Sequence, residues 1–576
     1  MKKSWSNRIF WILSLLLFSS WQGHVPVNYF RSPVDYSFSL SGSFGEIRQN
    51  HFHSGIDIRT GGVQGKPVYA VADGYVTRIN VSPSGFGKAL YIAHPNGYTS
   101  VYGHLKSYAG NIGSWIRAFQ YKQESFAVDT EVPQGLLKVK KGDVIAYSGN
   151  SGSSGGPHLH FEIRDSRTQE TIDPLEFGIK TADATPPQIR WIKIYPMDDN
   201  AMVNQASQPV LMAVSGRDGV YSLKSTDTVT VSGNIIFGIE TLDYAGSSGL
   251  HTGVHTIQLA VDGVQVYSHS LDHFLFSETR YVNSLMDYPA FIRNKQKIQR
   301  SYIAPNNKLS AYGKVINRGI INFSDRRSHQ IQYTVLDVFG NSAKLVFFVK
   351  SNPPSANAGI KKVPAPNSVQ QFKCKSDNLF ERNDIQFSLP EGALYEDLNF
   401  EYTASPPAQG VFSRVHYLQN QFVPLQTFCT LSIRPVNLPK NLMDKALIVK
   451  MGAGNYFSSA GGKYENGKVT TQIRDFGDYA VSVDTTSPVI RPVNIFNNKK
   501  VGKQSTIAVK ITDNLSGIKT YRATLNGRWI LMDYDLKSHQ LTYVFDEHIH
   551  PGKNVFLLTV TDAYSNSARY EASLLR

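Results

Sequence analysis

Residues 158–164 alternate between polar and apolar side chains and follow a glycine and serine run at 149–156. Successive side chains of a β-strand point to opposite faces, so a strand here would bury one set and present the other. The apolar set is Leu159, Phe161 and Ile163, and the opposite set is His158, His160 and Glu162. The chain must therefore form a sheet with two imidazoles on one face, which is the geometry of a site.

Neutral imidazole is the commonest metal ligand, and a catalytic zinc takes three protein ligands and leaves a fourth position open. Upstream, His53 and Asp57 lie four residues apart. In a straight strand their Cα atoms would be ~13 Å apart, too far to share one ion. We therefore expect a bend between them, which Ser54 and Gly55 permit. His104 follows a hairpin-like segment and offers a further imidazole.

The order H-x-x-x-D, then x-x-H-L, then H-x-H after a glycine-rich loop resembles the lysostaphin and LytM family of zinc metallopeptidases, which cut peptide bonds in bacterial cell walls. The resemblance covers residues 40–175 and no core position is missing. It implies that His53, Asp57 and His160 hold one zinc ion per chain. It also implies that His104 and His158 are catalytic, beside the scissile carbonyl.

Such a zinc would lower the pKa of its bound water toward ~7 and so create a nucleophile. We expect His158 to be the general base and His104 to stabilise the oxyanion or protonate the leaving amine, although the reverse assignment is open. Tyr102 is expected to orient His104 or the substrate. Glu162 either supports a ligand or, more commonly for such a residue, forms a surface ion pair.

The resemblance thus predicts a zinc-dependent endopeptidase that hydrolyses the peptide cross-links of bacterial peptidoglycan through a metal-activated water. Which bond is cut stays open. The alternative is a non-catalytic LytM-like protein that binds the wall or activates a separate hydrolase. Such proteins typically lack a ligand, whereas all five positions are filled here.

Other patterns are weaker. Residues 152–156 fit G-x-S-x-G, but that serine elbow joins a strand to a helix, whereas this loop leads into a strand. His548 and His550 form a second H-x-H, interpreted as a surface loop. A metal pair of His269 and His273 is disfavoured. His51 remains an alternative to His53.

The first 23 residues predict a secretory signal, with a basic start and a short apolar run at 9–18. The run is too short for a membrane span. Ser19 and Ser20 make a poor cleavage site, so removal of the segment is open. We expect an exported protein of the periplasm or cell envelope, or a secreted one.

The formal charge is +14, but the basic residues are scattered. Nucleic-acid binding is therefore disfavoured, because it needs a concentrated basic face. A diffuse positive surface suits a carboxylate-rich wall. Cys374 and Cys429 form either a disulfide or two buried thiols in this exported chain.

Short β-rich runs and tight turns predict a mainly β chain whose antiparallel peptidase-like domain spans 24–184. Within it, residues 111–134 form an expanded segment with apolar side chains at helical spacing after a candidate cap at Ser114. The apolar positions are Ile112, Trp115, Ile116 and Phe119. The segment is either a helix packed on the sheet or a lid beside His104.

An opening signature near Thr185 recurs near Thr486, and a closing signature at 334–343 recurs at 559–568. This internal repeat predicts Ig-like β-sandwich modules at 185–351 and 485–576, the first with an insertion at 272–317. Residues 352–367 are an expected linker, and 368–484 a third β-rich module. None shows a motif with chemistry, so we interpret them as architectural or adhesive, with contacts to the wall or to envelope proteins.

Overall fold

The computed structural model describes residues 28–179, 183–244, 251–352, 368–454 and 456–576. The expected signal segment at 1–23 and all but the first residue of the expected linker at 352–367 lie outside the described residues. The described part consists mainly of β-strands and has only a few short helices, so the expected mainly β fold is confirmed. No helix within these residues has the length and apolar character needed to cross a membrane.

The N-terminal domain is built on an antiparallel sheet of order β1-β4-β13-β8-β7-β6-β10. Its strands are β1 (Leu40–Gly42), β4 (Ile56–Arg59), β6 (Gly74–Val81), β7 (Lys88–Ala93), β8 (Tyr98–Gly103), β10 (Val128–Glu131) and β13 (His158–Asp165). The histidine-bearing β13 lies between β4 and β8, in the interior of the sheet. Leu159, Phe161 and Ile163 are fully buried, so the predicted alternation is confirmed.

A smaller sheet of β5 (Pro67–Tyr69), β12 (Val144–Tyr147) and β9 (Ser107–Tyr108) completes this domain, together with helix α1 (Gly110–Gln123). The predicted helix is present, but its N-cap is Ala109, which makes no side-chain cap. Ser114 lies inside the helix, so the expected cap was wrong. The helix starts early because Gly110 adopts a positive φ that turns the chain into it.

The first downstream module centres on the long strand β19 (Val229–Tyr244), which pairs with β15 (Gln188–Pro196), β20 (His251–Thr252) and β24 (Ile298–Arg300). Other strands are β17 (Val210–Arg217), β21 (Thr256–Val261), β22 (Val264–Ser270), β26 (Ser328–Leu336) and β27 (Ser342–Ser351). The segment at 272–317 includes β23 (His273–Phe274), α2 (Val282–Leu285) and α3 (Tyr288–Asn294). It packs Phe274 and Leu285 against Phe44 and Phe52 of the N-terminal domain.

Residues 368–484 form a six-stranded and a five-stranded sheet, and the last module a four-stranded and a five-stranded sheet. Their strands include β38 (Gly477–Val483), β41 (Thr506–Thr512), β42 (Ile518–Leu525), β44 (Met532–Asp535), β45 (Gln540–Val544), β46 (Lys553–Asp562) and β47 (Ser567–Leu575). Cys374 and Cys429 are buried free thiols, so no disulfide joins them.

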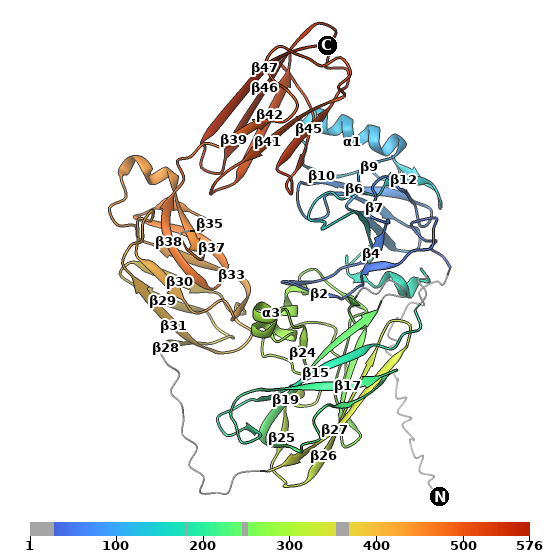
Figure 1. Ribbon diagram of the computed structural model, residues 1–576, viewed down its shortest axis with the longest axis vertical. Coiled ribbons are helices and arrows are strands. Elements are labelled where there is room, and N and C mark those ends of the chain that lie inside the picture. The colour runs from blue at the N-terminus through green and yellow to red at the C-terminus, as the bar shows by residue number, and fades with distance from the viewer. Residues whose placement is uncertain (1–27, 180–182, 245–250, 353–367, 455) are drawn as a thin grey trace, which may run out of the picture.

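The four units follow one another around a ring that closes on itself (Figure 1). Arg280 of the first module donates to the carbonyls of Leu425 and Arg474 in the next. Lys445 then donates to the carbonyl of Tyr564 in the last module. The ring closes where that module meets α1 of the N-terminal domain, so chain segments more than 400 residues apart in sequence are in contact.

Candidate functional site

The upstream half of the site depends on a bend between two short strands. β3 (His51–Phe52) ends just before His53, and β4 carries Asp57. A Cβ on Gly55 would lie 2.3 Å from the carbonyl oxygen of Phe161, so the close approach of the chain to β13 requires glycine there. The predicted bend is confirmed, because β3 and β4 belong to different sheets and His53 Nε2 lies only 3.0 Å from Asp57 Oδ1.

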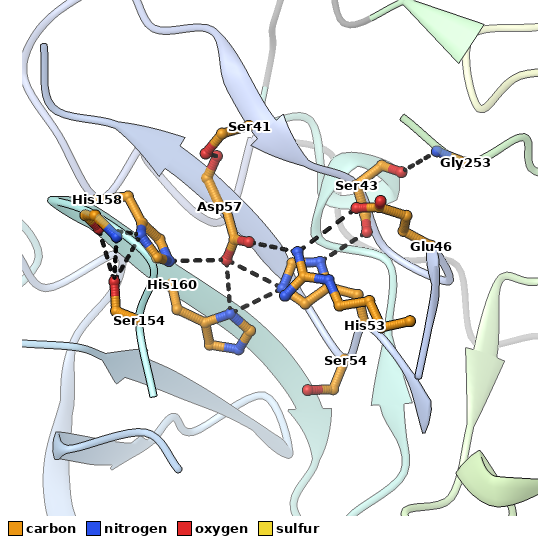
Figure 2. A network of polar contacts seen from close by, with 12 residues as sticks. Ser41, Ser43, Glu46, His53, Ser54, Asp57, Ser154, His158, His160 and Gly253 are labelled. Atoms are coloured by element: carbon orange, nitrogen blue, oxygen red, sulfur yellow. Dashed lines mark hydrogen bonds and ion pairs between the residues drawn. The ribbon is translucent and has the colours of Figure 1, made fainter. Parts of the chain in front are cut away.

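Three side chains converge on one point of this sheet (Figure 2). Across the β4–β13 ladder, Asp57 pairs directly with His160. His53 Nε2 and His160 Nδ1 lie 3.0 Å apart. Each also lies near Asp57 Oδ1, His53 Nε2 at 3.0 Å and His160 Nδ1 at 2.9 Å. The three predicted ligands thus present their donor atoms to one another as a triangle.

Both histidines of this triangle are oriented by oxygen acceptors on their far side. His53 Nδ1 lies 2.8 Å from the carbonyl oxygen of Ser43, and His160 Nε2 lies 2.9 Å from Glu162 Oε1. Because an oxygen acceptor takes a ring N–H, these contacts assign the lone pairs of His53 Nε2 and His160 Nδ1 to the centre. Two imidazole lone pairs that face each other and a carboxylate form a metal-binding donor set.

The spacing also fits zinc. Zinc bonds nitrogen and oxygen at ~2.0–2.2 Å, which separates tetrahedral ligand atoms by ~3.3 Å. The observed separations of 2.9–3.0 Å need only a small outward shift to reach that value. The donor set of two imidazoles and one carboxylate is therefore compatible with a zinc ion and leaves a coordination position open.

The pKa values of Asp57 and His160 are shifted by burial and by close contact with their neighbours. Burial disfavours a charged Asp57, yet the attraction of His53 and hydrogen bonds from His158 and His160 hold its pKa well below the usual range. Burial also opposes protonation of His160, but hydrogen bonds to Asp57 and Glu162 raise its pKa to about 9. A metal would replace the proton that His160 then carries on Nδ1.

Glu162 is fully buried, so the expectation of a surface ion pair was wrong. Its Oε2 accepts from Arg164 Nε at 2.7 Å, and its Oε1 accepts from Ser54 and contacts His160. The site face of β13 is covered at this point, which the strand alternation alone could not reveal. The other interpretation, support of a ligand, agrees with this geometry.

Two further histidines stand beside the triangle. His104 follows β8 with a φ of 57° and directs Nδ1 at the carbonyl of Ser151, 2.9 Å away. Burial, together with His160 and His158, lowers the pKa of His104 to about 3, so it is neutral near pH 7. His158 Nδ1 lies 2.8 Å from the carbonyl of Gly156, and its Nε2 lies 3.3 Å from Asp57 Oδ1.

A groove of about 470 Å³ opens over these rings. Its lining includes His104, His158, Asp57, the residues 153–157 of the glycine-rich loop, and two arginines, Arg48 and Arg59. Arg48 Nη2 donates to Asp57 Oδ2 at 2.7 Å. The groove is therefore polar and partly cationic, with the two histidines on its floor.

Tyr102 does not reach this groove, so its expected orienting role was wrong. It is fully buried, and its hydroxyl oxygen accepts hydrogen bonds within the core, from the backbone N–H of Val71 and from Ser100 Oγ. Tyr102 pairs with Phe161 on β13, and strand alternation sends both side chains to the core face.

Other sequence candidates lie away from the triangle. His51 is exposed and contacts the carbonyl of Gln49. His269 is buried against Tyr267 and Gln299. The loop containing Gly152 to Gly156 leads into strand β13 and not into a helix, so it is not a serine elbow. His548 stacks on Tyr121 with a centroid distance of 5.0 Å, so the expected surface loop is an interdomain contact.

The last module reaches the glycine-rich loop, which no sequence motif indicated. Lys537 donates to the carbonyl oxygens of Asn150 and Ser154. Helix α1 is held by the same module, through Arg117 and Tyr121 to Asp546. No residue of α1 lines the groove, so the helix is an interdomain support rather than a wall of the site.

Comparison with known proteins matches peptidase family M23 to residues 51–121 and 129–174, and a Zu5-like domain to 369–484. The DD-carboxypeptidase/endopeptidase Mpg of Neisseria meningitidis is 31% identical over 133 residues, 23% of this chain and 24% of Mpg. An uncharacterized metalloprotease of Haemophilus influenzae is 36% identical over 111 residues, 19% of this chain and 18% of that protein.

The murein hydrolase activator NlpD of Salmonella typhimurium is 28% identical over 164 residues, 28% of this chain and 34% of NlpD. Among solved structures, the catalytic domain of lysostaphin from Staphylococcus simulans is 23% identical, covers 24% of this chain and 91% of its own, and has a TM-score of 0.19. The chain spans about a quarter of the length of the first curated relatives that it matches.

Proposed function

Residues 51–174 form a peptidase family M23 domain of the LytM type, and on this premise we propose that the protein is a zinc-dependent endopeptidase acting on the peptide cross-links of bacterial peptidoglycan. The observation that carries the proposal is the completeness of the site. Three donor atoms meet within 3.0 Å, and the far nitrogen of each histidine is anchored to an oxygen.

His53, Asp57 and His160 would hold the zinc. When bound there, zinc supplies Lewis acidity, which makes a water nucleophilic near neutral pH. The chain's own part is to fix the ligand geometry: Ser43 and Glu162 hold the two imidazoles in the tautomers that direct a lone pair inward. This arrangement limits the reorganisation needed during the reaction.

His104 and His158 would handle the proton. In each ring Nδ1 faces a carbonyl oxygen, of Ser151 or Gly156, so Nδ1 carries the hydrogen and Nε2 is the basic atom. His158 Nε2 lies 3.3 Å from Asp57 Oδ1, so the basic atom of this ring stands beside the residues that would hold the metal. We therefore assign the general base to His158, which would pass the proton that it takes to the leaving amine, and we place His104 at the scissile bond as a second, neutral imidazole.

The groove supports a peptide substrate that bears carboxylates. Arg59 lines it and forms no ion pair among the described residues. Peptide stems of the cell wall carry such carboxylates, and Arg59 would bind one as a charge-assisted pair. The similarity to a DD-carboxypeptidase/endopeptidase and to a murein hydrolase activator, together with the predicted leader, supports a location in the cell envelope.

The direct experiment incubates the purified full-length protein with purified peptidoglycan and identifies the released peptides by mass spectrometry, with zinc content measured on the same sample. We expect one zinc per chain and release of cross-link peptides. Zinc binding without any released peptide would contradict the proposal. That result would favour an activator, a function named for NlpD.

A further inference from the structure

Two clusters of three aspartates lie far from the zinc ligands. The first, here called the entry triad, consists of Asp183, Asp243 and Asp337; the second, the exit triad, consists of Asp484, Asp513 and Asp562. In each triad one oxygen from every carboxylate lies within 4.8 Å of the other two. Neither cluster has a role in the proposed peptidase chemistry.

The two triads occupy equivalent places in the repeated modules. Asp183 and Asp484 stand at the entrance, where each accepts from the N–H of the threonine two residues later. Asp337 and Asp562 stand in the closing turn, where each accepts from the backbone and side chain of an asparagine four residues later. The third member lies at the end of the strand that pairs with the opening strand: Asp243 is the penultimate residue of β19, and Asp513 directly follows β41.

The entry triad has an unsatisfied acceptor. Asp243 is only 6% exposed, and its Oδ1 is buried without a hydrogen-bond partner. The exit triad repeats this feature, because Asp513 Oδ1 is also buried without a partner. No lysine or arginine pairs with any of the six carboxylates in the described part of the chain. A buried carboxylate without a counter-charge is costly, and it is normally paired or bound to a metal.

There is room for an ion beside the entry triad. A cavity of about 30 Å³ is lined by Asp183 and Asp243 but not by Asp337, together with Thr252, His255 and apolar side chains such as Phe44 and Leu271. A volume of ~10–15 Å³ is enough for one water-sized occupant. Burial and the neighbouring Asp337 also raise the pKa of Asp243 to about 8, as expected when carboxylates crowd together without a cation.

We propose that the entry triad binds a Ca²⁺ ion, and that the exit triad, its counterpart in the repeat, binds a second one. The donors are all oxygens, which suits a hard cation rather than zinc, which favours nitrogen and sulfur. Ca²⁺ binds oxygen at ~2.3–2.6 Å, so two ligands of one ion lie no more than ~5 Å apart, and the carboxylate oxygens of each triad are close enough to share one ion. Each ion would link the segment that precedes a module, through Asp183 or Asp484, to two aspartates inside that module.

The entry ion also lies near the support of a zinc ligand. Asp243 pairs across the ladder with Thr252, and the next residue, Gly253, donates its N–H to Ser43 Oγ at 2.9 Å. The carbonyl of Ser43 holds His53 Nδ1, and Figure 2 shows this succession from Gly253 to His53. Ca²⁺ at the entry triad therefore stabilises the edge that orients His53, whereas Ca²⁺ at the exit triad does not.

Equilibrium dialysis of the full-length protein against labelled Ca²⁺ tests the proposal. We expect two ions per chain in the wild type, one in Asp243→Asn, one in Asp513→Asn and none in the double variant. His160→Ala should still bind two, which separates this proposal from the proposed peptidase function. Wild-type protein that binds no Ca²⁺ at millimolar concentration, or an Asp243→Asn variant that binds as much as the wild type, would overturn it.

Thermal unfolding gives a second test, which depends on whether Asp243→Asn raises or lowers the unfolding temperature. At pH 9 and without Ca²⁺, Asp243→Asn should unfold at a higher temperature than the wild type, because Asp243, with its pKa raised to about 8, is ionised there beside two other carboxylates. With Ca²⁺, the wild type should gain stability and the variant should gain less. An equal response in both proteins would contradict Ca²⁺ binding at this triad. Asp218→Asn, at an exposed aspartate of the same module, is the matched control.

Discussion

The two halves of the peptidase site are built differently. His53, Asp57 and His160 lie on or beside the paired strands β4 and β13, and each is no more than 5% exposed. His104 and His158 border the glycine-rich loop, and the side chain of His158 is 15% exposed at the groove. The ligand half is held by a sheet, whereas the loop half is held by backbone carbonyls and by a contact from another module.

This difference separates two tasks. A metal site needs fixed donors, and the buried ligand half supplies them with outer hydrogen bonds that set each tautomer. Substrate binding and proton transfer need access and some adjustment, which the loop half permits. Substitutions in the ligand half should therefore change metal content, whereas substitutions in the loop half should change turnover or substrate affinity at constant metal content.

The largest effect is expected for His160→Ala. Removing this ligand leaves two donors and places Glu162 beside an empty space, so zinc and activity should be lost together. Zinc analysis and peptidoglycan digestion on one preparation would measure both. His539→Ala, at an exposed histidine of the last module, should change neither. A His160→Ala protein that still cleaved wall peptides would refute the ligand assignment.

His158→Ala should lower turnover by ~10²–10⁴-fold, the usual contribution of a general base. Its zinc content should equal that of the wild type, because the three ligands remain. Steady-state kinetics on a cross-linked peptide, with zinc analysis in parallel, would check this. Loss of zinc in this variant would show that the two halves are not separable in the way described.

Glu162→Gln should weaken zinc binding by ~10–100-fold, the range for partners that orient a metal-bound histidine. The variant keeps the size of the side chain but removes the charge that faces His160 and Arg164. Competition with a zinc chelator would measure the affinity. Glu131→Gln, at an exposed position of the same domain, serves as control; an unchanged affinity in Glu162→Gln would remove Glu162 from the metal site.

Lys537→Ala should have the smallest effect, a rise of a few-fold in KM with zinc content unchanged. The substitution removes the donor shared by the carbonyls of Asn150 and Ser154, so the groove loop loses its contact with the last module. Kinetics beside Lys519→Ala, an exposed lysine of that module, would isolate the contact. A change in zinc content would contradict the division between the two halves.

Two features of the ligand half could be predicted from the residues themselves: strand alternation placed His158 and His160 on one face, and Ser54-Gly55 permitted the bend. The assignment of His53, Asp57 and His160 as the ligands came from the resemblance to the LytM family, because Asp57 and His160 are 103 residues apart. Glu162 was assigned to the surface because alternation reports a face and not what covers it. Tyr102 was misplaced for a related reason, since nearness in sequence to His104 says nothing about a side chain directed to the opposite face.

Less of the loop half could be predicted from the sequence, because part of it depends on contacts with residues far away in the chain. Lys537 lies 383 residues from Ser154, and no motif marks it. The helix at 110–123 was expected from its spacing, but its partner, the last module, was not. The repeat of opening and closing signatures did locate the equivalent modules. The closing signatures contain two of the six triad aspartates, Asp337 and Asp562, and two more, Asp183 and Asp484, lie two residues before the opening signatures. The convergence of the six appears only in the folded chain.

The central claim is that one zinc ion, held by His53, Asp57 and His160, is required for cleavage of wall peptides. Its most direct test is to remove metal from the purified full-length protein and to follow peptide release from peptidoglycan as zinc is added back. The account predicts no release without metal and a rise that levels off at one zinc per chain. Full release by the metal-free protein, or none at any amount of zinc, would contradict it.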